Sequence, residues 1–230
     1  MAVPTLIYTA NIAHRDTIRT QREQSIPVDW LYLTDEPEIA PAPWYTQRVP
    51  RSADHPNMAA KWWRTHPMVG YEHAIWIDAN MEITYPHFAR EAIMAVRDGI
   101  GVWAHPRRDC VYDEADASMG AESQGGRYAN LPIPQQVAAY RSEGYPAHNG
   151  LYATGTLVWT PERYALGHQW FEECRRWGFQ DQISFPVVCW RHGVKPGTFP
   201  VTQTQGRYNR RAGWWGNAWL LLHDHNAETG

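Results

Sequence analysis

Short apolar segments that favour β-strands alternate with helix-forming segments along most of this chain. Consecutive strands joined by helices pair in parallel, because each helix carries the chain back across the sheet. The sequence therefore predicts an α/β domain with a mainly parallel central sheet flanked by helices. The expected strands are Val3–Tyr8, Trp30–Leu33, Ala74–Ile77, Ile100–Ala104 and Leu151–Trp159. The expected helices are Thr17–Gln24 (with Asp16 as N-cap), Met58–Thr65, Pro86–Arg97, Pro134–Glu143, Pro161–Trp177 and Asp181–Arg191.

Length and composition indicate one domain, residues 1–230, and exclude several classes of protein. A chain of 230 residues, 43% of them hydrophobic, can bury a sizeable core. A formal net charge of -3 gives no basic face for nucleic acid. No apolar run reaches the roughly 20 residues that span a bilayer. The absence of a secretory signal and the three widely spaced cysteines lead us to expect a cytoplasmic protein.

One expected strand runs directly into Asp78-Ala79-Asn80. In an open α/β sheet, ligands bind at the carboxyl ends of the strands. Asp78 and Asn80 lie two residues apart, so both can offer oxygen to one hard divalent cation, Mn²⁺ or Mg²⁺. The same tripeptide also suits a plain turn, because Asp and Asn favour turns.

Further polar side chains stand where a phosphate-bearing ligand could reach them. They follow the first strand, precede the strand that delivers the acidic motif, or follow the strand after it. A cation there can neutralise a diphosphate, and an arginine can grip a phosphate with its planar guanidinium. Each also fits an ordinary loop or a solvated surface. The candidates are Thr9, Asn11, Lys61, Arg64, His66 and Arg107.

Asp181 and Gln182 open an expected helix, and two interpretations of the aspartate are open. It can cap the helix, or it can face the reacting sugar or the acceptor hydroxyl as a catalytic carboxylate. Residues 109–130 are polar and rich in Gly and Ser, and we expect an irregular, mobile loop there.

His223 and His225 lie in a C-terminal tail of about residues 205–230. Two residues apart on an extended segment, they should point to opposite faces, so only one should reach a metal. The alternative is a frayed tail, because chain ends are often poorly ordered.

In this order, the segments resemble a glycosyltransferase-like family long catalogued as a domain of unknown function. Its plant members include turgor-regulation-defect and mucilage-related proteins. The sharpest stretches are Trp76–Asp78 and Asp181–Phe185, and the resemblance extends from about Leu6 to about Lys195. It implies a GT-A-type, Rossmann-like domain that binds a nucleoside diphosphate sugar through a divalent cation. It further implies transfer of the sugar to a glycan or other hydroxyl acceptor.

The resemblance also implies roles for individual residues. Asp78 takes the place of the metal-site aspartate, and Asn80 departs from the second acidic position, where an amide is a neutral ligand. A C-terminal histidine, His223 or His225, completes the metal shell. Asp181-Gln182 matches the Asp-Gln motif that faces the active site.

Two other classes of protein stay open at this point. The first is a non-catalytic carbohydrate-binding or scaffold domain of the same fold, in which some of the 13 tryptophans stack on sugar rings. The second is a metal-dependent phosphoesterase, although the sequence lacks the dense His/Asp cluster of a two-metal site. A transferase should need the cation to bind nucleotide, whereas a binding module should ignore both.

Overall fold

The computed structural model describes residues 4–53, 55–120, 126–201, 207–209 and 214–225. Its central sheet has seven strands in the order β3-β2-β1-β4-β7-β6-β8, and β7 runs antiparallel to both of its neighbours while the other pairs are parallel. The predicted fold class, a Rossmann-like α/β domain with a mainly parallel sheet, is confirmed. In sheet order the strands are β3 (Tyr45–Arg48), β2 (Asp29–Thr34), β1 (Thr5–Asn11), β4 (His73–Ile77), β7 (Tyr152–Trp159), β6 (Ile100–Ala104) and β8 (Gly197–Thr198).

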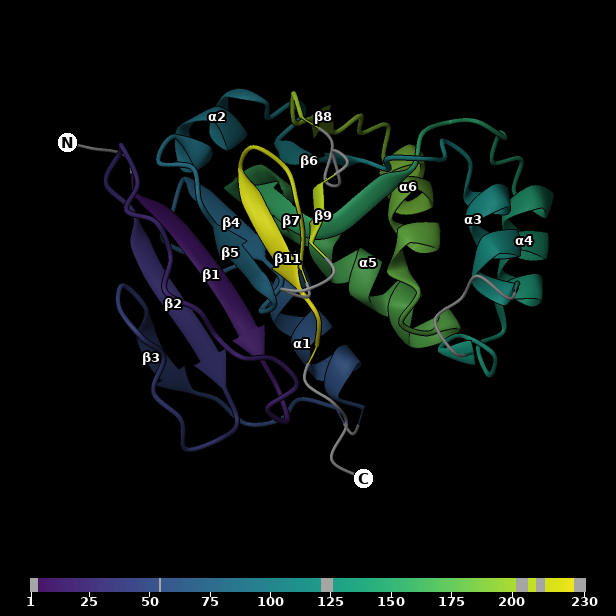
Figure 1. The fold of residues 1–230 in the computed structure, drawn as a ribbon. Coiled ribbons are helices and arrows are strands. Elements are labelled where there is room, and N and C mark those ends of the chain that lie inside the picture. Colours follow the sequence, from purple (N-terminus) through teal and green to yellow (C-terminus); the bar gives the residue numbers. More distant parts are fainter. Residues whose placement is uncertain (1–3, 54, 121–125, 202–206, 210–213, 226–230) are drawn as a thin grey trace.

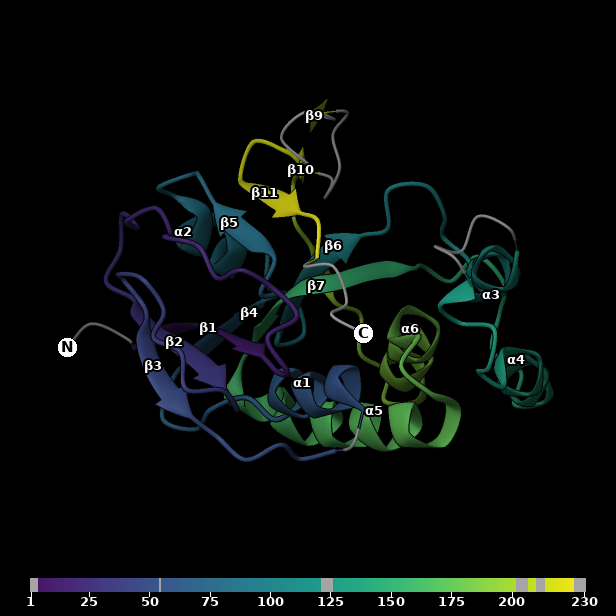
Figure 2. The ribbon, with the colours of Figure 1, turned by 60° about the horizontal axis from the view of Figure 1, so that its bottom comes forward.

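Helices cover both faces of this sheet (Figures 1 and 2). On one face lie α1 (Pro56–Thr65), α5 (Tyr164–Trp177, preceded by the 3-10 turn Pro161–Arg163) and α6 (Asp181–Arg191). On the other face lie α2 (Phe88–Met94) and a second, smaller sheet. The pair α3 (Val111–Met119) and α4 (Ile133–Ser142) extends the molecule beside α6. No helix in the described part of the chain is long and apolar enough to cross a membrane.

The second sheet joins the C-terminal segment to the residues after Asp78. Its order is β5-β11-β10-β9, and all its pairs are antiparallel. The frayed-tail alternative is therefore wrong for the described C-terminal strands, because β11 pairs with β5 immediately beyond the end of β4. The strands are β5 (Met81–Ile83), β11 (Leu220–His223), β10 (Trp214–Gly216) and β9 (Arg207–Asn209).

Aromatic side chains fill the core on both faces of the central sheet. Trp103, Trp159 and Trp170 are fully buried, and Trp76 and Trp219 are almost so. These indoles are therefore mainly packing residues. Close helix packing adds to the core: a Cβ on Gly167 of α5 would lie 2.2 Å from the carbonyl oxygen at the end of α1.

Several sequence expectations fail near the N-terminus. Thr9–Asn11, placed after the first expected strand, belong to β1, and β3 lies in a segment where no strand was expected. No helix forms over Thr17–Gln24. The side chains of Gln21 and Gln24 instead accept hydrogen bonds from the backbone around β5 and α2. Tertiary hydrogen bonds of this kind replace the helical ones that local propensity favoured.

The segment 109–130 also differs from the expectation, because its first half is helical. Val111 and Ala115 are fully buried and Tyr112 nearly so, and they form one core cluster with residues of α4 and α6. Burial of this apolar face stabilises α3 although the surrounding sequence is polar. The mobility expected of this loop stays a prediction.

Candidate active site

Asp78 lies directly after β4 and opens into a cavity of about 580 Å³. Its backbone N–H donates to the Gly155 carbonyl at 2.8 Å, which fixes the turn against β7. The indole N–H of Trp76 donates to Asp78 Oδ1 at 2.9 Å. The side chain is 39% exposed, so one oxygen is held while the carboxylate stays open to a ligand.

A buried group of charged side chains also lines the cavity. Lys61 and Arg64 lie three residues apart on α1 and so share one face of the helix. Both contact the same carboxylate oxygen of Asp181, on the first turn of α6. Thr154 donates its hydroxyl to the other oxygen at 3.3 Å. The three charged side chains are 6–11% exposed, so this group is almost entirely shielded from water.

Asp181 does not cap its helix, because Gln180 occupies the N-cap position. The capping interpretation is therefore wrong, and the carboxylate turns instead toward the two cations of α1. Burial and the neighbouring Arg64 guanidinium lower the pKa of Lys61, and the charge of Asp78 acts in the opposite direction. Arg64 also lies 3.8 Å from Asp78 Oδ1, so one guanidinium is within ion-pair distance of both aspartates.

The C-terminal segment also lines the cavity. Asn80 Nδ2 donates to the His223 carbonyl at 2.8 Å, and the His223 N–H donates to the Asn80 carbonyl at 2.9 Å. The His223 imidazole lies 2.8 Å from a carboxylate oxygen of Glu82. Asn80 thus fastens the end of β11 beside Asp78.

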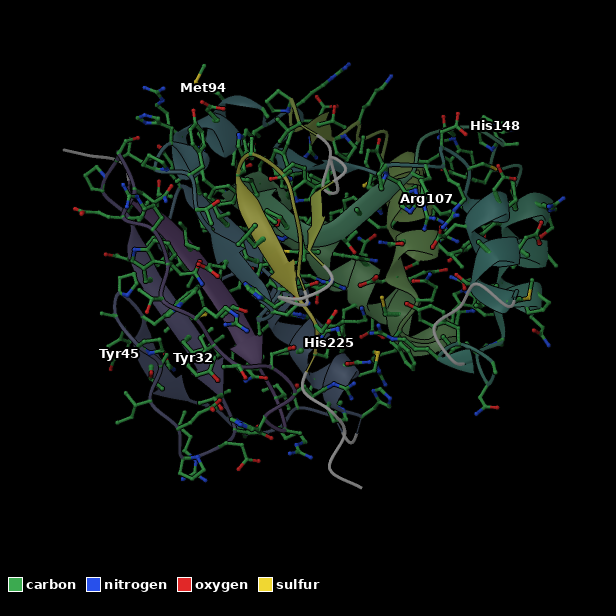
Figure 3. All side chains as sticks on the ribbon, in the orientation of Figure 1. Tyr32, Tyr45, Met94, Arg107, His148 and His225 are labelled. Atoms are coloured by element: carbon green, nitrogen blue, oxygen red, sulfur yellow. The ribbon has the colours of Figure 1, made fainter. Side chains whose placement is uncertain are left out.

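His225 follows two residues later (Figure 3) and lies 2.6 Å from a carboxylate oxygen of Asp16. That hydrogen bond, with the charges of Asp16 and Asp78, raises the pKa of His225. Both histidines line the cavity, contrary to the expectation that they face opposite ways. The reason is that β11 ends at His223, so the strand alternation does not extend to His225.

Three of the sequence candidates lie behind the cavity wall. Thr9 is buried within β1. Asn11, also buried, bonds both backbone groups of Asp16, at 3.1 and 2.7 Å, and so positions that residue. His66 ends α1, where its ring stacks between Trp62 and His168 with centroids 3.6 and 4.2 Å away.

Arg107 lies at a neighbouring cavity of about 510 Å³ (Figure 3), which also has His105 and Arg108 in its wall. Burial and these arginines lower the pKa of His105 to about 4. Gln182 lines both cavities, as do Arg127 and Tyr128. The two cavities therefore adjoin at the start of α6.

Sequence reasoning missed Asp16, Arg127 and Tyr128 as members of the site. Asp16 looked like a helix cap, and its contact with His225 joins residues too far apart in the chain for spacing to reveal. Arg127 and Tyr128 lie in the segment expected to be an irregular loop. Their Arg-Tyr pair beside a polar loop was the one signal that could have indicated them.

The parallel sheet, with charged side chains gathered at the carboxyl end of β4, defines a Rossmann-like domain with its site where such folds bind ligands. A family model described as TOD1/MUCI70, glycosyltransferase-like domain, matches residues 60–203, more than half of the chain. The chain therefore belongs to this family, and the resemblance drawn from the sequence is confirmed. A search of the curated proteins found no match.

Proposed function

We propose that this domain is a metal-dependent glycosyltransferase that moves a sugar from a nucleoside diphosphate to a hydroxyl of a glycan or other acceptor. One observation carries the proposal: in a domain of a glycosyltransferase-like family, the open Asp78 and the charge-paired Asp181 line the same cavity. Its volume of about 580 Å³ falls within the ~300–1,000 Å³ typical of ligand sites.

We place the divalent cation beside Asp78, because the nearby side chains offer ligand types that suit it. Asp78 offers a carboxylate oxygen that is not engaged by the Trp76 indole. His223 and His225 each have one ring nitrogen beside a carboxylate, from Glu82 and Asp16. A carboxylate in that place commonly orients a metal-ligating imidazole. This donor set of oxygen and imidazole nitrogen suits Mn²⁺ or Mg²⁺, and a bound cation would neutralise the departing diphosphate.

The other residues bind and position the reactants. Lys61 and Arg64 hold Asp181 in place before a ligand arrives, and they add positive charge near a diphosphate. Asp181 steadies the positively charged sugar of the transition state or takes the proton of the acceptor hydroxyl. Gln182 lines both cavities where they adjoin, so we place the acceptor hydroxyl there. The rest of the acceptor would lie in the second cavity, which Arg107 lines.

Calorimetry with a panel of nucleoside diphosphates, with and without Mn²⁺, tests this function. We expect binding only when Mn²⁺ is present, and an affinity at least tenfold lower in Asp78→Asn. Asp29→Asn is the matched control, because Asp29 begins β2 at the opposite end of the sheet. Equal affinity with and without the cation, or an unchanged Asp78→Asn variant, would contradict the proposal, and failure to bind any nucleoside diphosphate would favour a binding module.

A further inference from the structure

A second group of metal-ligating side chains lies outside both cavities of the candidate active site. It consists of Cys110, Asp113 and His148, whose ligand atoms all lie within 4.8 Å of one another. Cys110 is the N-cap of α3, Asp113 lies in the first turn, and His148 comes from the connection between α4 and β7. Figure 3 places His148 beside α3 and α4, far from His225.

The contacts around His148 hold its imidazole in one orientation, as expected for a metal ligand. Its Nδ1 lies 2.8 Å from a carboxylate oxygen of Asp109, within hydrogen-bond distance. The Asp109 carbonyl in turn accepts from the Gly150 N–H at 2.9 Å. His148 has a φ of +53°, a left-handed conformation that non-glycine residues adopt rarely and that surrounding contacts must maintain. A carboxylate on one ring nitrogen is the usual support of an imidazole that binds metal through the other.

Burial differs among the three ligands in a way that suits an ion. Cys110 is 2% exposed, whereas Asp113 and His148 are exposed. An ion could therefore reach the group from solvent and keep a water molecule as its fourth ligand. Three protein ligands of the sulfur, nitrogen and oxygen types, with one open position, are typical of Zn²⁺. A thiolate ligand disfavours the hard cations Mn²⁺ and Mg²⁺, so this group differs in chemistry from the residues around Asp78.

We propose that Cys110, Asp113 and His148 bind one Zn²⁺ ion, with Asp109 orienting the His148 imidazole. The ion joins the start of α3 to the connection between α4 and β7. Hydrogen bonds connect α3 to the candidate active site. From that helix, Glu114 and Ser118 accept hydrogen bonds from Gln180 Nε2 at 3.1 and 2.7 Å. Gln180 directly precedes Asp181, so the ion would brace the helix that holds the start of α6.

The test is metal binding by the full chain after treatment with a chelator. We expect one Zn²⁺ per chain in a competition titration. Co²⁺ in its place should give a thiolate-to-metal absorption band, which reports on the cysteine alone. Cys110→Ser should remove that band, whereas Cys189→Ser, a substitution of another buried cysteine, should keep it.

Histidine and aspartate variants give a second measurement that does not depend on the cysteine. His148→Gln and Asp109→Asn should each weaken Zn²⁺ at least tenfold, and His192→Gln, at an exposed position, should not. Asp78→Asn should leave the cobalt band unchanged, which separates this site from the proposed active-site cation. Absence of stoichiometric Zn²⁺, a band that survives in folded Cys110→Ser, or equal affinities in His148→Gln and His192→Gln would overturn the proposal.

Discussion

Asp78 and Asp181 line one cavity, but their surroundings are opposite. Asp78 is 39% exposed, accepts one indole N–H and lies 3.8 Å from its nearest cation. Asp181 is 7% exposed and contacts both Lys61 and Arg64. One site can therefore hold both kinds of carboxylate: one left open for a ligand, and one whose charge is already paired.

The difference follows from where each aspartate lies in the fold. Asp78 stands at a strand end, where the turn leaves the side chain free. Asp181 stands on a helix that packs behind the sheet beside α1, where an unpaired charge would be costly. Paired charges that are fixed before binding need no rearrangement during a reaction, which is how electrostatic preorganisation assists catalysis.

The two aspartates should differ most in how much their substitution lowers the free energy of unfolding. Asp181→Asn leaves two buried cations without their carboxylate and should cost about 3–5 kcal/mol of unfolding free energy. Asp78→Asn should change it by less than about 1 kcal/mol, because that carboxylate is partly solvated. Urea unfolding followed by circular dichroism measures both.

Equal losses in the two variants would show that the burial contrast has no energetic meaning. Lys61→Met combined with Asp181→Asn provides the control. The double variant should lose less than the sum of the single losses, because the two residues are in contact. Simple additivity would mean that the pair is not coupled.

The sequence predicted five of the seven strands of the central sheet, because those five are mostly apolar and buried, and it missed the exposed β3 and the short β8. The expected strand Ile100–Ala104 and helix Asp181–Arg191 agree with β6 and α6 at both ends. It failed at Thr17–Gln24, where glutamine side chains bond to a distant strand. No local pattern contains that information, because the partner lies about 60 residues away in the chain.

The same limit applied to the candidate site. Spacing indicated Asp78, and Lys61 and Arg64 were candidates for binding a diphosphate. The sequence could not show that these two cations contact Asp181, because the contact of Lys61 with Asp181 joins residues 120 positions apart. Capping was a reasonable local interpretation of Asp181, and tertiary packing overruled it.

A smaller effect is expected in the pH dependence of stability, through His66 at the end of the helix that carries Lys61 and Arg64. Burial lowers the pKa of His66 to about 4, below its ordinary 6.5. The unfolded chain therefore takes up this proton first, and stability should fall as pH drops from about 6.5 to about 4. After allowance for partial exposure of the ring, we expect a loss of about 1–2 kcal/mol. His66→Gln should flatten that part of the stability curve.

His105 is the matched comparison, because its pKa also falls to about 4 but it lies at the second cavity. His105→Gln should remove a separate part of the slope, and the two changes should add. Comparing each variant with the parent over the same range subtracts the carboxylates that titrate there. A His66→Gln curve parallel to the parent curve would mean that this ring titrates normally in the folded protein.

The smallest effect is expected for Asn80, which lies two residues after Asp78. Asn80 donates to the His223 carbonyl, so Asn80→Ala should cost about 0.5–1.5 kcal/mol, the usual contribution of one hydrogen bond. Asn80→Asp also loses the donor and should be destabilised at least as much. It nevertheless adds a second carboxylate two residues after Asp78, so it should bind Mn²⁺ more tightly than Asn80→Ala does. Paired unfolding and Mn²⁺ titrations distinguish the two roles of this position.

Unchanged stability in Asn80→Ala would mean that Asn80 does not fasten β11, and equal Mn²⁺ affinities would mean that its side chain does not reach the cation.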